Sequence, residues 1–345
     1  MHFYKNRKVL ITGGASFIGS HLVDRLLDLQ ARVTVVDDLS SGRLENLKDS
    51  MARIKFYQGD LRQQTVAKEV MQGQEIVFHL ANIHGGRGFI DSHPGEIVQN
   101  FLIDGNIFYM ACQMGVNRIC FTSSACVYPI TLQEDPAKIG VIYLEESMAD
   151  PFVPGKALAD REYGWAKLMA EMSLRAYHQQ FGLKGVSCRL FSVYGPRENE
   201  SHSIIALIGK ALLKQDPYEI WGSGQQNRNF TYVSDIIEGL LLATEKITDC
   251  RAVNIGGNEF VKIADAARLI CDLVGHRPKE FFFDTSKPEG VHTRVASTEN
   301  QQKWLSFKPK VSFIEGLKNT IDWYIKNVDL KLLKKELGNK LFERK

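Results

Sequence analysis

Tyr163 and Lys167 are four residues apart in a segment whose pattern predicts a helix, so their side chains are expected on one helix face. An ammonium group beside a phenol lowers the pKa of the phenol from about 10 toward neutrality. Such a tyrosine can take a proton from a hydroxyl group while a hydride leaves the same carbon. Ser123 and Ser124 end a predicted strand, at the sheet edge where ligands bind in parallel α/β folds. The Tyr–Lys spacing alone also occurs in purely structural helices, but together with the two serines it predicts a redox site for an alcohol.

A glycine-rich turn, ITGGASFIGSHL, joins the first predicted strand to the first predicted helix, where a phosphate-binding turn belongs. Gly13, Gly14 and Gly19 permit close backbone approach, and the helix N-terminus offers free N–H groups to an anion. Asp37 ends the second predicted strand, where a carboxylate accepts hydrogen bonds from ribose hydroxyls and repels a 2′-phosphate. The pattern predicts NAD rather than NADP. The alternative is a tight turn followed by a solvated aspartate.

Further coenzyme contacts are expected from this turn and from the carboxyl ends of the later strands. Asp60, after the third strand, is expected to reach the adenine amino group. Beyond the three glycines and Asp37, the expected NAD contacts are Ser16, Phe17, Ile18, Asp60, Leu61, Leu80, Ala81, Asn100, Tyr163 and Lys167.

Short apolar runs alternate with helical patterns over the first half of the chain. The expected strands are Lys8–Thr12, Arg32–Asp37, Lys55–Asp60, Glu75–Leu80, Arg118–Thr122 and Gly185–Phe191. The expected helices are Ser20–Leu29, Ile97–Met114, Asp160–Phe181, Ile204–Lys214, Asp235–Thr244 and Lys262–Val274. This alternation predicts an α/β fold with a Rossmann-type, doubly wound parallel sheet.

The alternation ends near Tyr194, where a polar loop leads into short strands and turns. We therefore expect an NAD-binding domain over residues 1–193, including the catalytic Ser, Tyr and Lys. A smaller, mixed C-terminal lobe over residues 194–327 is expected mainly to bind substrate, with some elements rejoining the first sheet. Residues 328–345 are predicted to form a charged helical tail.

Composition excludes several classes of protein. The chain has 345 residues, 44% hydrophobic and 24% charged, which is typical of globular domains. Its net charge of +3 is too balanced for a general nucleic-acid binder. No apolar run of about 18 residues and no leading signal peptide are evident. The six scattered cysteines form no Cys-x-x-Cys pair, so we expect no metal centre, no disulfide framework and a reducing, cytoplasmic location.

TGGASFIG, Asp37, TSSACVYP and YGWAK together resemble the extended short-chain dehydrogenase/reductases, which modify nucleotide sugars. Four further stretches resemble, more narrowly, the GDP-mannose 3,5-epimerases. They are GGRGFI (Gly85–Ile90), SSACVYP (Ser123–Pro129), IWGSGQQNRNFTYV (Ile220–Val233) and PEGVHTR (Pro288–Arg294). The resemblance implies that bound NAD transiently oxidises carbon 4 of a sugar, after which protons are removed and returned at carbons 3 and/or 5.

The resemblance also implies roles for individual residues. Ser124, Tyr163 and Lys167 would surround carbon 4, and Cys126 would be the base that removes a proton beside the new ketone. Outside this motif, a cysteine at a strand end is more often a buried thiol. The family's acid is a lysine in the loop that follows the Tyr-Gly-Pro motif. This chain has the motif but lacks that lysine. His202 falls nearest to that place and can return a proton, although it can equally be interpreted as a surface loop residue.

Arg228 and Arg294 resemble the arginines that clamp the diphosphate in this family. A guanidinium group suits that role because it can donate two parallel hydrogen bonds to phosphate oxygens. Either arginine could instead form a surface ion pair. Gly86, Arg87 and Ser124 are expected to contact the sugar.

Two further departures from the family pattern are Ser16, in place of the middle glycine of the coenzyme motif, and Ser192, in place of an asparagine. The sequence as a whole favours an NAD-dependent nucleotide-sugar epimerase that acts on a GDP-hexose, as a homodimer formed through the helix bearing Tyr163. The alternatives are a 4-epimerase or 4-dehydrogenase of a GDP- or UDP-linked hexose or heptose, and a nucleotide-binding protein that has lost catalysis.

Overall fold

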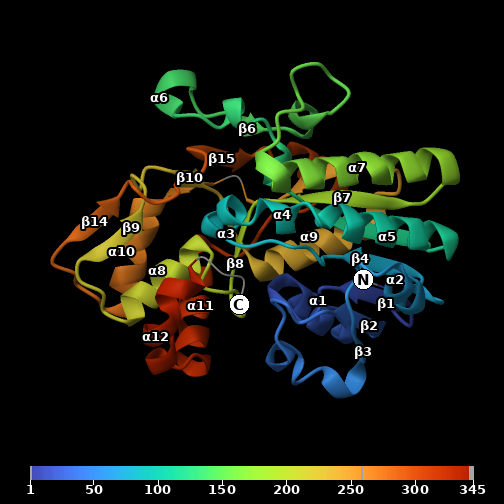
Figure 1. Ribbon diagram of the computed structural model, residues 1–345, viewed down its shortest axis with the longest axis horizontal. Helices are drawn as coiled ribbons and strands as arrows, with labels where there is room; N and C mark the ends of the chain where they lie inside the picture. Colours follow the sequence, from blue (N-terminus) through green and yellow to red (C-terminus); the bar gives the residue numbers. More distant parts are fainter. Residues whose placement is uncertain (1, 258, 342–345) are drawn as a thin grey trace.

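The computed structural model describes residues 2–257 and 259–341. Its larger lobe is built around a sheet of seven parallel strands (Figure 1). From edge to edge these are β12 (Ala252–Ile255), β7 (Gly185–Leu190), β5 (Arg118–Ser124), β4 (Ile76–His79), β1 (Lys8–Thr12), β2 (Arg32–Asp37) and β3 (Lys55–Gln58). The chain order reverses between β1 and β4, so the carboxyl ends of these strands border the crevice where ligands bind in doubly wound folds.

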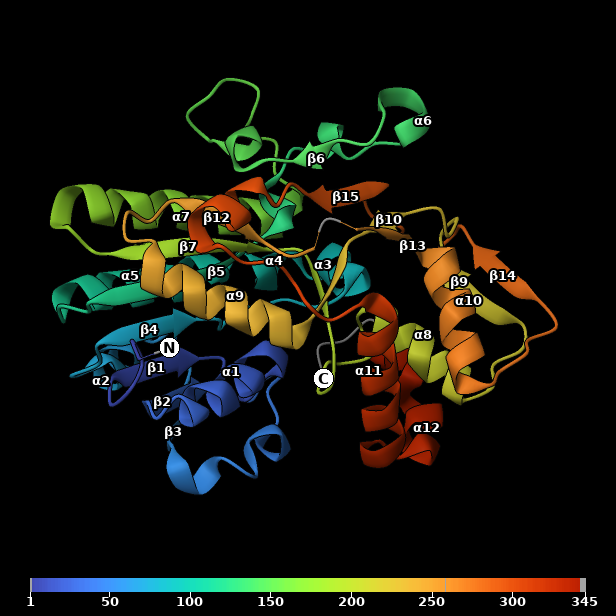
Figure 2. The ribbon, with the colours of Figure 1, turned by 180° about the vertical axis from the view of Figure 1, so that it is seen from behind.

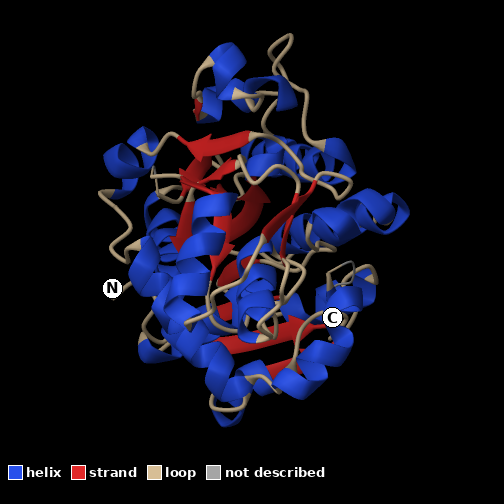
Figure 3. Ribbon diagram, turned by 90° about the vertical axis from the view of Figure 1, so that its left-hand side faces the viewer, coloured by secondary structure: helices blue, strands red, loops and turns tan. Residues whose placement is uncertain are grey.

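Helices cover both faces of this sheet (Figure 2 and Figure 3). In β1, Val9 and Ile11 belong to the core on one face and Leu10 to the core on the other. Because side chains alternate along a strand, an uninterrupted apolar strand needs cover on both sides. One face carries α1 (Phe17–Asp28) and α9 (Val233–Lys246), and the other carries α2 (Gln64–Met71), α5 (Asn100–Gln113) and α7 (Arg161–Phe181).

The smaller lobe has a core of its own. Its helices are α8 (Ser203–Leu212), α10 (Ile263–Val274), α11 (Phe313–Asn327) and α12 (Leu330–Lys340). The described strands outside the large sheet form three small sheets. The first has four strands, in the order β13 (Val261–Lys262), β10 (Asn227–Arg228), β15 (Thr293–Ala296) and β6 (Tyr143–Leu144). The other two are pairs, β11 (Phe230–Tyr232) with β8 (Ser192–Tyr194) and β14 (Phe281–Asp284) with β9 (Tyr218–Trp221). Short helical segments are α3 (Arg87–Ser92), α4 (Pro94–Ile97), α6 (Pro136–Ile139), η1 (Leu44–Leu47), η2 (Met51–Arg53), η3 (Ala125–Val127), η4 (Ile130–Leu132), η5 (Glu146–Ala149) and η6 (Gln301–Leu305).

This architecture confirms the predicted α/β fold with a Rossmann-type sheet and a smaller mixed lobe. One predicted helix was wrong in extent, because Ile97–Met114 is interrupted. Between α4 and α5 the backbone forms hydrogen bonds that span three residues rather than four. Phe101 N–H donates to the Val98 carbonyl, and Leu102 N–H donates to the Gln99 carbonyl. Such i to i+3 bonds tighten the chain and separate the two helices.

The boundary between the two lobes does not fall at one position in the sequence, such as residue 193. Strand β12 and helix α9 come from the second half of the sequence but pack in the larger lobe, and β6 from the first half pairs with β15. Helix α12 of the tail packs on the smaller lobe, because its Leu333 is buried and lies near Gly209 of α8. The predicted tail residues 342–345 lie outside the described residues.

Among residues 2–257 and 259–341, no helix has the length and apolar character that crossing a membrane requires. Nor do three His, Cys, Asp or Glu side chains gather there in a way that would hold a metal ion. All six cysteines are free thiols.

Two loops from different lobes meet above the crevice. The Gly86 N–H donates to Ser201 Oγ at 3.3 Å, and a Cβ atom on Gly86 would stand only 1.9 Å from the Ser201 carbonyl oxygen. A side chain at position 86 would therefore push the two backbones apart. The absence of a side chain at Gly86 is needed for this contact between the loops.

Replacing Gly86 by alanine should accordingly destabilise the protein by about 1–3 kcal/mol, the usual cost of overpacking. The free energy of unfolding in urea measures the loss. Gly95→Ala is the matched control, since no atom lies within 4 Å of the position its Cβ would occupy. Equal stabilities of the two variants would show that the loop contact is loose.

Candidate active site

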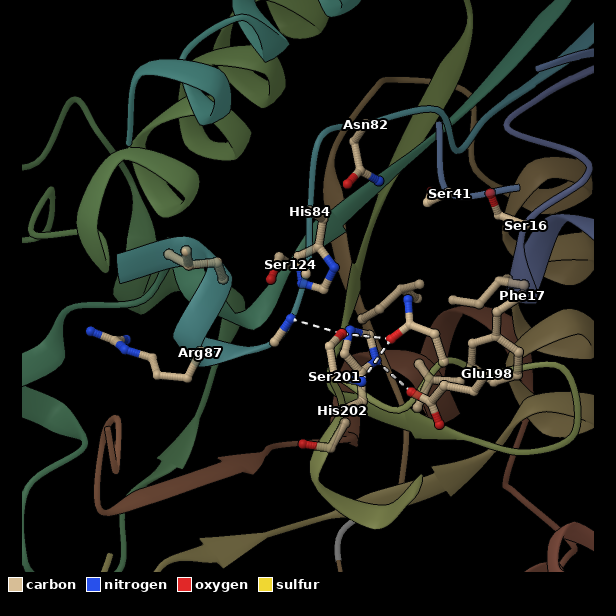
Figure 4. A pocket seen from close by; sticks show the side chains of 18 of the residues that line it. Ser16, Phe17, Ser41, Asn82, His84, Arg87, Ser124, Glu198, Ser201 and His202 are labelled. Carbon is tan, nitrogen blue, oxygen red and sulfur yellow. Dashed lines mark hydrogen bonds and ion pairs between the residues drawn. The ribbon is translucent and has the colours of Figure 1, made fainter. Parts of the chain in front are cut away.

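A cavity of about 520 Å³ opens at the carboxyl ends of the central strands and extends to the smaller lobe (Figure 4). It is lined by most of the residues that the sequence singled out: Gly13, Ser16, Phe17, Ile18, Gly19, Asp37, Asp60, Leu61, Leu80, Ala81, Gly86, Arg87, Ser124, Cys126, Tyr163, His202, Arg228 and Arg294. Gly14, Asn100 and Lys167 do not line it.

The glycine-rich turn leaves no room for side chains. Gly13 has φ +70°, and a Cβ there would lie 2.9 Å from the backbone nitrogen of Ala81. A Cβ on Gly19 would be 2.2 Å from the Gly13 carbonyl oxygen, and one on Gly14 would press on Val35. Ser16 has φ −85°, which any residue adopts, so a serine in place of the middle glycine leaves the turn intact. The turn thus keeps its backbone open to a phosphate group at the start of α1.

Asp37 and Asp60 line the cavity at the carboxyl ends of β2 and β3. The Asp37 carboxylate accepts hydrogen bonds from Ala15 N–H and Leu39 N–H, each at 2.9 Å, and is buried. Arg62 donates to both oxygens of Asp60 and thereby holds the pKa of this carboxyl below its usual value. A fixed carboxylate at the end of β2 suits ribose hydroxyls and disfavours a 2′-phosphate.

Asn100 contacts the loop backbone instead of lining the cavity. Its amide donates to the Ile83 carbonyl at 2.9 Å and accepts from Ile83 N–H at 2.7 Å. Both ends of this buried amide are used, so Asn100 holds the loop that follows β4.

Tyr163 and Ser124 meet at the crevice, and Lys167 lies behind them. Ser124 is the last residue of β5, and its side chain is hydrogen-bonded to Tyr163. The ammonium of Lys167 is 5.8 Å from the centroid of the Tyr163 ring, is buried, and has no hydrogen-bond partner among the described residues. Burial raises the pKa of Tyr163, which is opposite to the lowering that the sequence predicted. At 5.8 Å the lysine does not outweigh the loss of hydration around the phenol.

The unpartnered ammonium, the glycine turn and the Asp37 carboxylate fit a nicotinamide dinucleotide. A buried ammonium requires acceptors, and the hydroxyl groups of a ribose are acceptors of the right kind. Lys167 would hold the ribose next to nicotinamide, Asp37 the other ribose, and the turn the pyrophosphate.

Cys126 lies in the same cavity, two residues after Ser124. Helix α7 packs closely against the backbone of Cys126, because a Cβ atom on Gly164 of this helix would be 2.2 Å from the Cys126 carbonyl oxygen. Arg294 Nη1 donates to Cys126 Sγ at 3.1 Å. This contact brings a positively charged guanidinium group to the sulfur. The predicted base is therefore placed beside the predicted redox residues.

Both predicted clamp arginines reach the cavity, but their donors are engaged inside the protein. Arg294 also donates to Gln133 Oε1 at 2.6 Å and to Asp160 Oδ2 at 2.9 Å. Arg228 donates to the carbonyls of Asn227, His292 and Val291. Burial, helped by the charge of Arg294, lowers the pKa of Arg228 to about 9.

Asp160, which the sequence analysis missed, joins Arg294 to Arg87. Arg87 Nη1 donates to Asp160 Oδ1 at 3.1 Å. Burial acts to raise the pKa of Asp160, but the charges of Arg294 and Arg87 outweigh it and lower the pKa. Asp160 directly precedes helix α7, and nothing in its local sequence marks it as a partner of distant arginines.

Two histidines and a glutamate form another wall of the cavity. His202 Nδ1 is 2.5 Å from Glu198 Oε1, and Glu198 is buried. Burial raises the pKa of Glu198, while His202 opposes the shift. The His84 ring contacts the rings of both Tyr163 and His202, and Figure 4 shows the two histidines in the cavity. His84 and Glu198 were missed, although His84 directly precedes the GGRGFI stretch.

A model of the NAD dependent epimerase/dehydratase family matches residues 9–256. GDP-mannose 3,5-epimerase of Arabidopsis thaliana is 30% identical over 331 residues, which cover 94% of this chain and 84% of that protein. An uncharacterized UDP-glucose epimerase of Bacillus subtilis, YtcB, is 32% identical over 324 residues, covering 91% and 96%. The structure of UDP-glucuronic acid 4-epimerase from Bacillus cereus with UDP-glucuronic acid and NAD has a TM-score of 0.81 and 26% identity, covering 93% and 100%. The chain therefore belongs to the NAD-dependent epimerase/dehydratase family of enzymes, with NAD as its coenzyme.

Proposed function

We propose that this enzyme inverts carbon 3, carbon 5 or both in a nucleotide-linked hexose after transient oxidation at carbon 4. The observation that carries the proposal is the position of Cys126. Its sulfur shares a cavity with Tyr163 and accepts a hydrogen bond from Arg294. Oxidation at carbon 4 alone requires no such base, whereas proton removal beside the ketone does.

The first step uses residues of the larger lobe. The glycine turn, Asp37 and Lys167 would hold NAD, which when bound would supply a reversible hydride acceptor for carbon 4. Tyr163 takes the proton of the carbon 4 hydroxyl, and Ser124 holds that hydroxyl through its own hydroxyl group. Because burial favours the protonated phenol, proton transfer depends on positive charge near the ring. Lys167 is the cation that α7 places there.

The second step uses two walls of the cavity. A ketone at carbon 4 acidifies the hydrogens on carbons 3 and 5, so a thiolate can remove one of them. Cys126 forms an S–H bond as the C–H bond breaks, and the electron pair moves into the enolate. The Glu198–His202 pair supplies a proton on the other wall, in place of the lysine that this loop lacks. The carbon is inverted when the proton returns to the opposite face.

We propose a GDP-hexose as the substrate. The support is the 30% identity to the GDP-mannose 3,5-epimerase of Arabidopsis thaliana. Arg87 and Arg228 add positive charge to the cavity wall, which suits a diphosphate, and Gly86 brings backbone close to the sugar. To clamp the diphosphate directly, Arg228 and Arg294 would exchange some of their internal hydrogen bonds for phosphate oxygens.

A second candidate is a 4-epimerase or 4-dehydrogenase of a GDP- or UDP-linked hexose or heptose. It is favoured by the overall similarity to the UDP-glucuronic acid 4-epimerase structure. Ser124, Tyr163 and Lys167 would suffice for it, and Cys126 would then transfer no proton.

We also propose that the enzyme works as a homodimer in the cytoplasm. The helices α5 and α7 pack side by side and expose large apolar side chains, which an interface between two copies would cover: Phe101, Leu102, Tyr109, Trp165 and Met169. The free thiols suit a reducing compartment.

A panel of GDP-, UDP- and dTDP-sugars in deuterated water tests the function. A GDP-hexose should reduce the bound coenzyme transiently, seen in its absorbance, and should gain deuterium at carbon 3 or 5, seen by NMR and mass spectrometry. The Tyr163→Phe variant should do neither. Inversion at carbon 4 without deuterium gain would establish the second candidate.

Replacing Cys126 by serine should separate the two steps. Deuterium gain should fall by about 10²–10⁴-fold, the usual contribution of a general base, while coenzyme reduction stays within a few-fold of wild type. Cys112→Ser, on α5 and outside the cavity, is the control. Unchanged deuterium gain in the Cys126 variant would remove the thiol from the reaction.

The dimer is tested by light scattering after gel filtration. The double variant Leu102→Asp/Met169→Asp should be monomeric and still bind NAD, because a charge on each helix opposes burial of the α5–α7 face. Ile325→Asp, at a 54% exposed side chain on α11 of the smaller lobe, should remain dimeric. A monomeric wild-type protein would refute this assembly.

A further inference from the structure

His84 lies between two groups to which the proposed function gives proton-transfer roles. Its ring centroid is 4.7 Å from that of Tyr163 and 5.2 Å from that of His202. All three residues line the cavity, and Figure 4 shows His84 beside Ser124 and above His202. His84 is thus within reach of a sugar whose carbon 4 hydroxyl is held by Tyr163.

His202 is poorly placed to reach the sugar by itself. Its Nδ1 is engaged by Glu198 at 2.5 Å. Its other ring nitrogen, Nε2, is buried and has no hydrogen-bond partner among the described residues. The His84 ring stands edge-to-face against His202, at 77°. The nitrogen of His202 that is not bound to Glu198 is therefore buried, with the imidazole of His84 as its neighbour.

The backbone around His84 is fixed on both sides. Ile83 is bound through its N–H and its carbonyl by the side chain of Asn100. Gly86 is bound to Ser201, which directly precedes His202. These two anchors hold His84 against the loop that carries His202 and leave little freedom for the imidazole to move away. A fixed geometry of this kind is what proton transfer between two side chains requires.

We propose that His84 is the catalytic acid that delivers the proton to the sugar carbon, and that His202 and Glu198 recharge it. This inference rests on the proposed function. In the step, an N–H bond of protonated His84 breaks as the enolate electron pair forms the new C–H bond. His84 then takes a proton from protonated His202, and Glu198 stabilises the positive charge on His202 before that transfer. His84 is thus the catalytic residue of this wall, and His202 and Glu198 act through it.

The variant His84→Gln tests the role, because glutamine fills a similar space and cannot be an acid. Single-turnover deuterium gain at carbon 3 or 5 should fall by about 10²–10⁴-fold, while sugar-dependent coenzyme reduction stays within a few-fold of wild type. His93→Gln is the matched control, since His93 stacks on Phe89 and does not line the cavity. Retained NAD binding shows that the variant is folded.

Two further measurements distinguish a catalytic role from a structural one. If the three residues act in one pathway, His84→Gln/His202→Gln should lose no more deuterium gain than His84→Gln alone. In His84→Ala, added imidazole should restore part of the deuterium gain by occupying the vacated space. Additive losses or an absence of rescue would overturn the proposal.

The outcomes separate this inference from the proposed function. Wild-type deuterium gain that persists in His84→Gln would refute the role of His84 and leave the proposed function standing. Equal losses of coenzyme reduction and deuterium gain would also refute it, because His84 would then support Tyr163 or sugar binding. A wild-type enzyme that reduces its coenzyme but gains no deuterium with any sugar would refute the proposed function itself.

Discussion

The site depends on one buried positive charge, the ammonium of Lys167. Burial lowers the pKa of this group, and the negative charges of Asp104 and Glu171 oppose the shift. Glu171 is already paired with Arg189 at 2.8 Å and accepts a hydrogen bond from Ser123. Asp104 is therefore the carboxylate left to balance Lys167. Without it, a buried ammonium next to Tyr163 would tend to lose its proton, and with it the positive charge beside the phenol ring.

A chain of hydrogen bonds links Asp104 to the backbone around the coenzyme. Thr12 Oγ1 accepts from the N–H groups of Leu80 and Ala81, so its single proton is left for His79 Nδ1, at 2.8 Å. The Nε2 of His79 then carries the ring proton and donates it to Asp104 at 2.9 Å. Burial lowers the pKa of His79, so the ring is neutral and leaves the charge of Asp104 for Lys167. The same threonine thus fixes the β4 loop and, through His79, the electrostatics behind Tyr163.

The elements of the sheet could be predicted because each carries its own local signal. Apolar runs, the glycine turn and the Tyr–Lys spacing are short-range patterns, and Asp37 ends its strand as expected. What could not be predicted depends on contacts between distant segments. Arg228 looks like a phosphate ligand in sequence, and only the fold shows its donors used by backbone carbonyls. In the sequence His84 is an isolated histidine in a loop, and only the fold shows that the loop bearing Ser201 lies beside it.

The two proposed steps depend differently on how the lobes meet. Tyr163, Lys167 and Ser124 all lie on β5 and α7, so the residues proposed for the redox step come from the larger lobe alone. The proton-returning wall joins the β4 loop to the loop before α8, and the Arg294 that holds Cys126 comes from β15. Proton transfer at carbons 3 and 5 is therefore the step that changes in these loops can alter first.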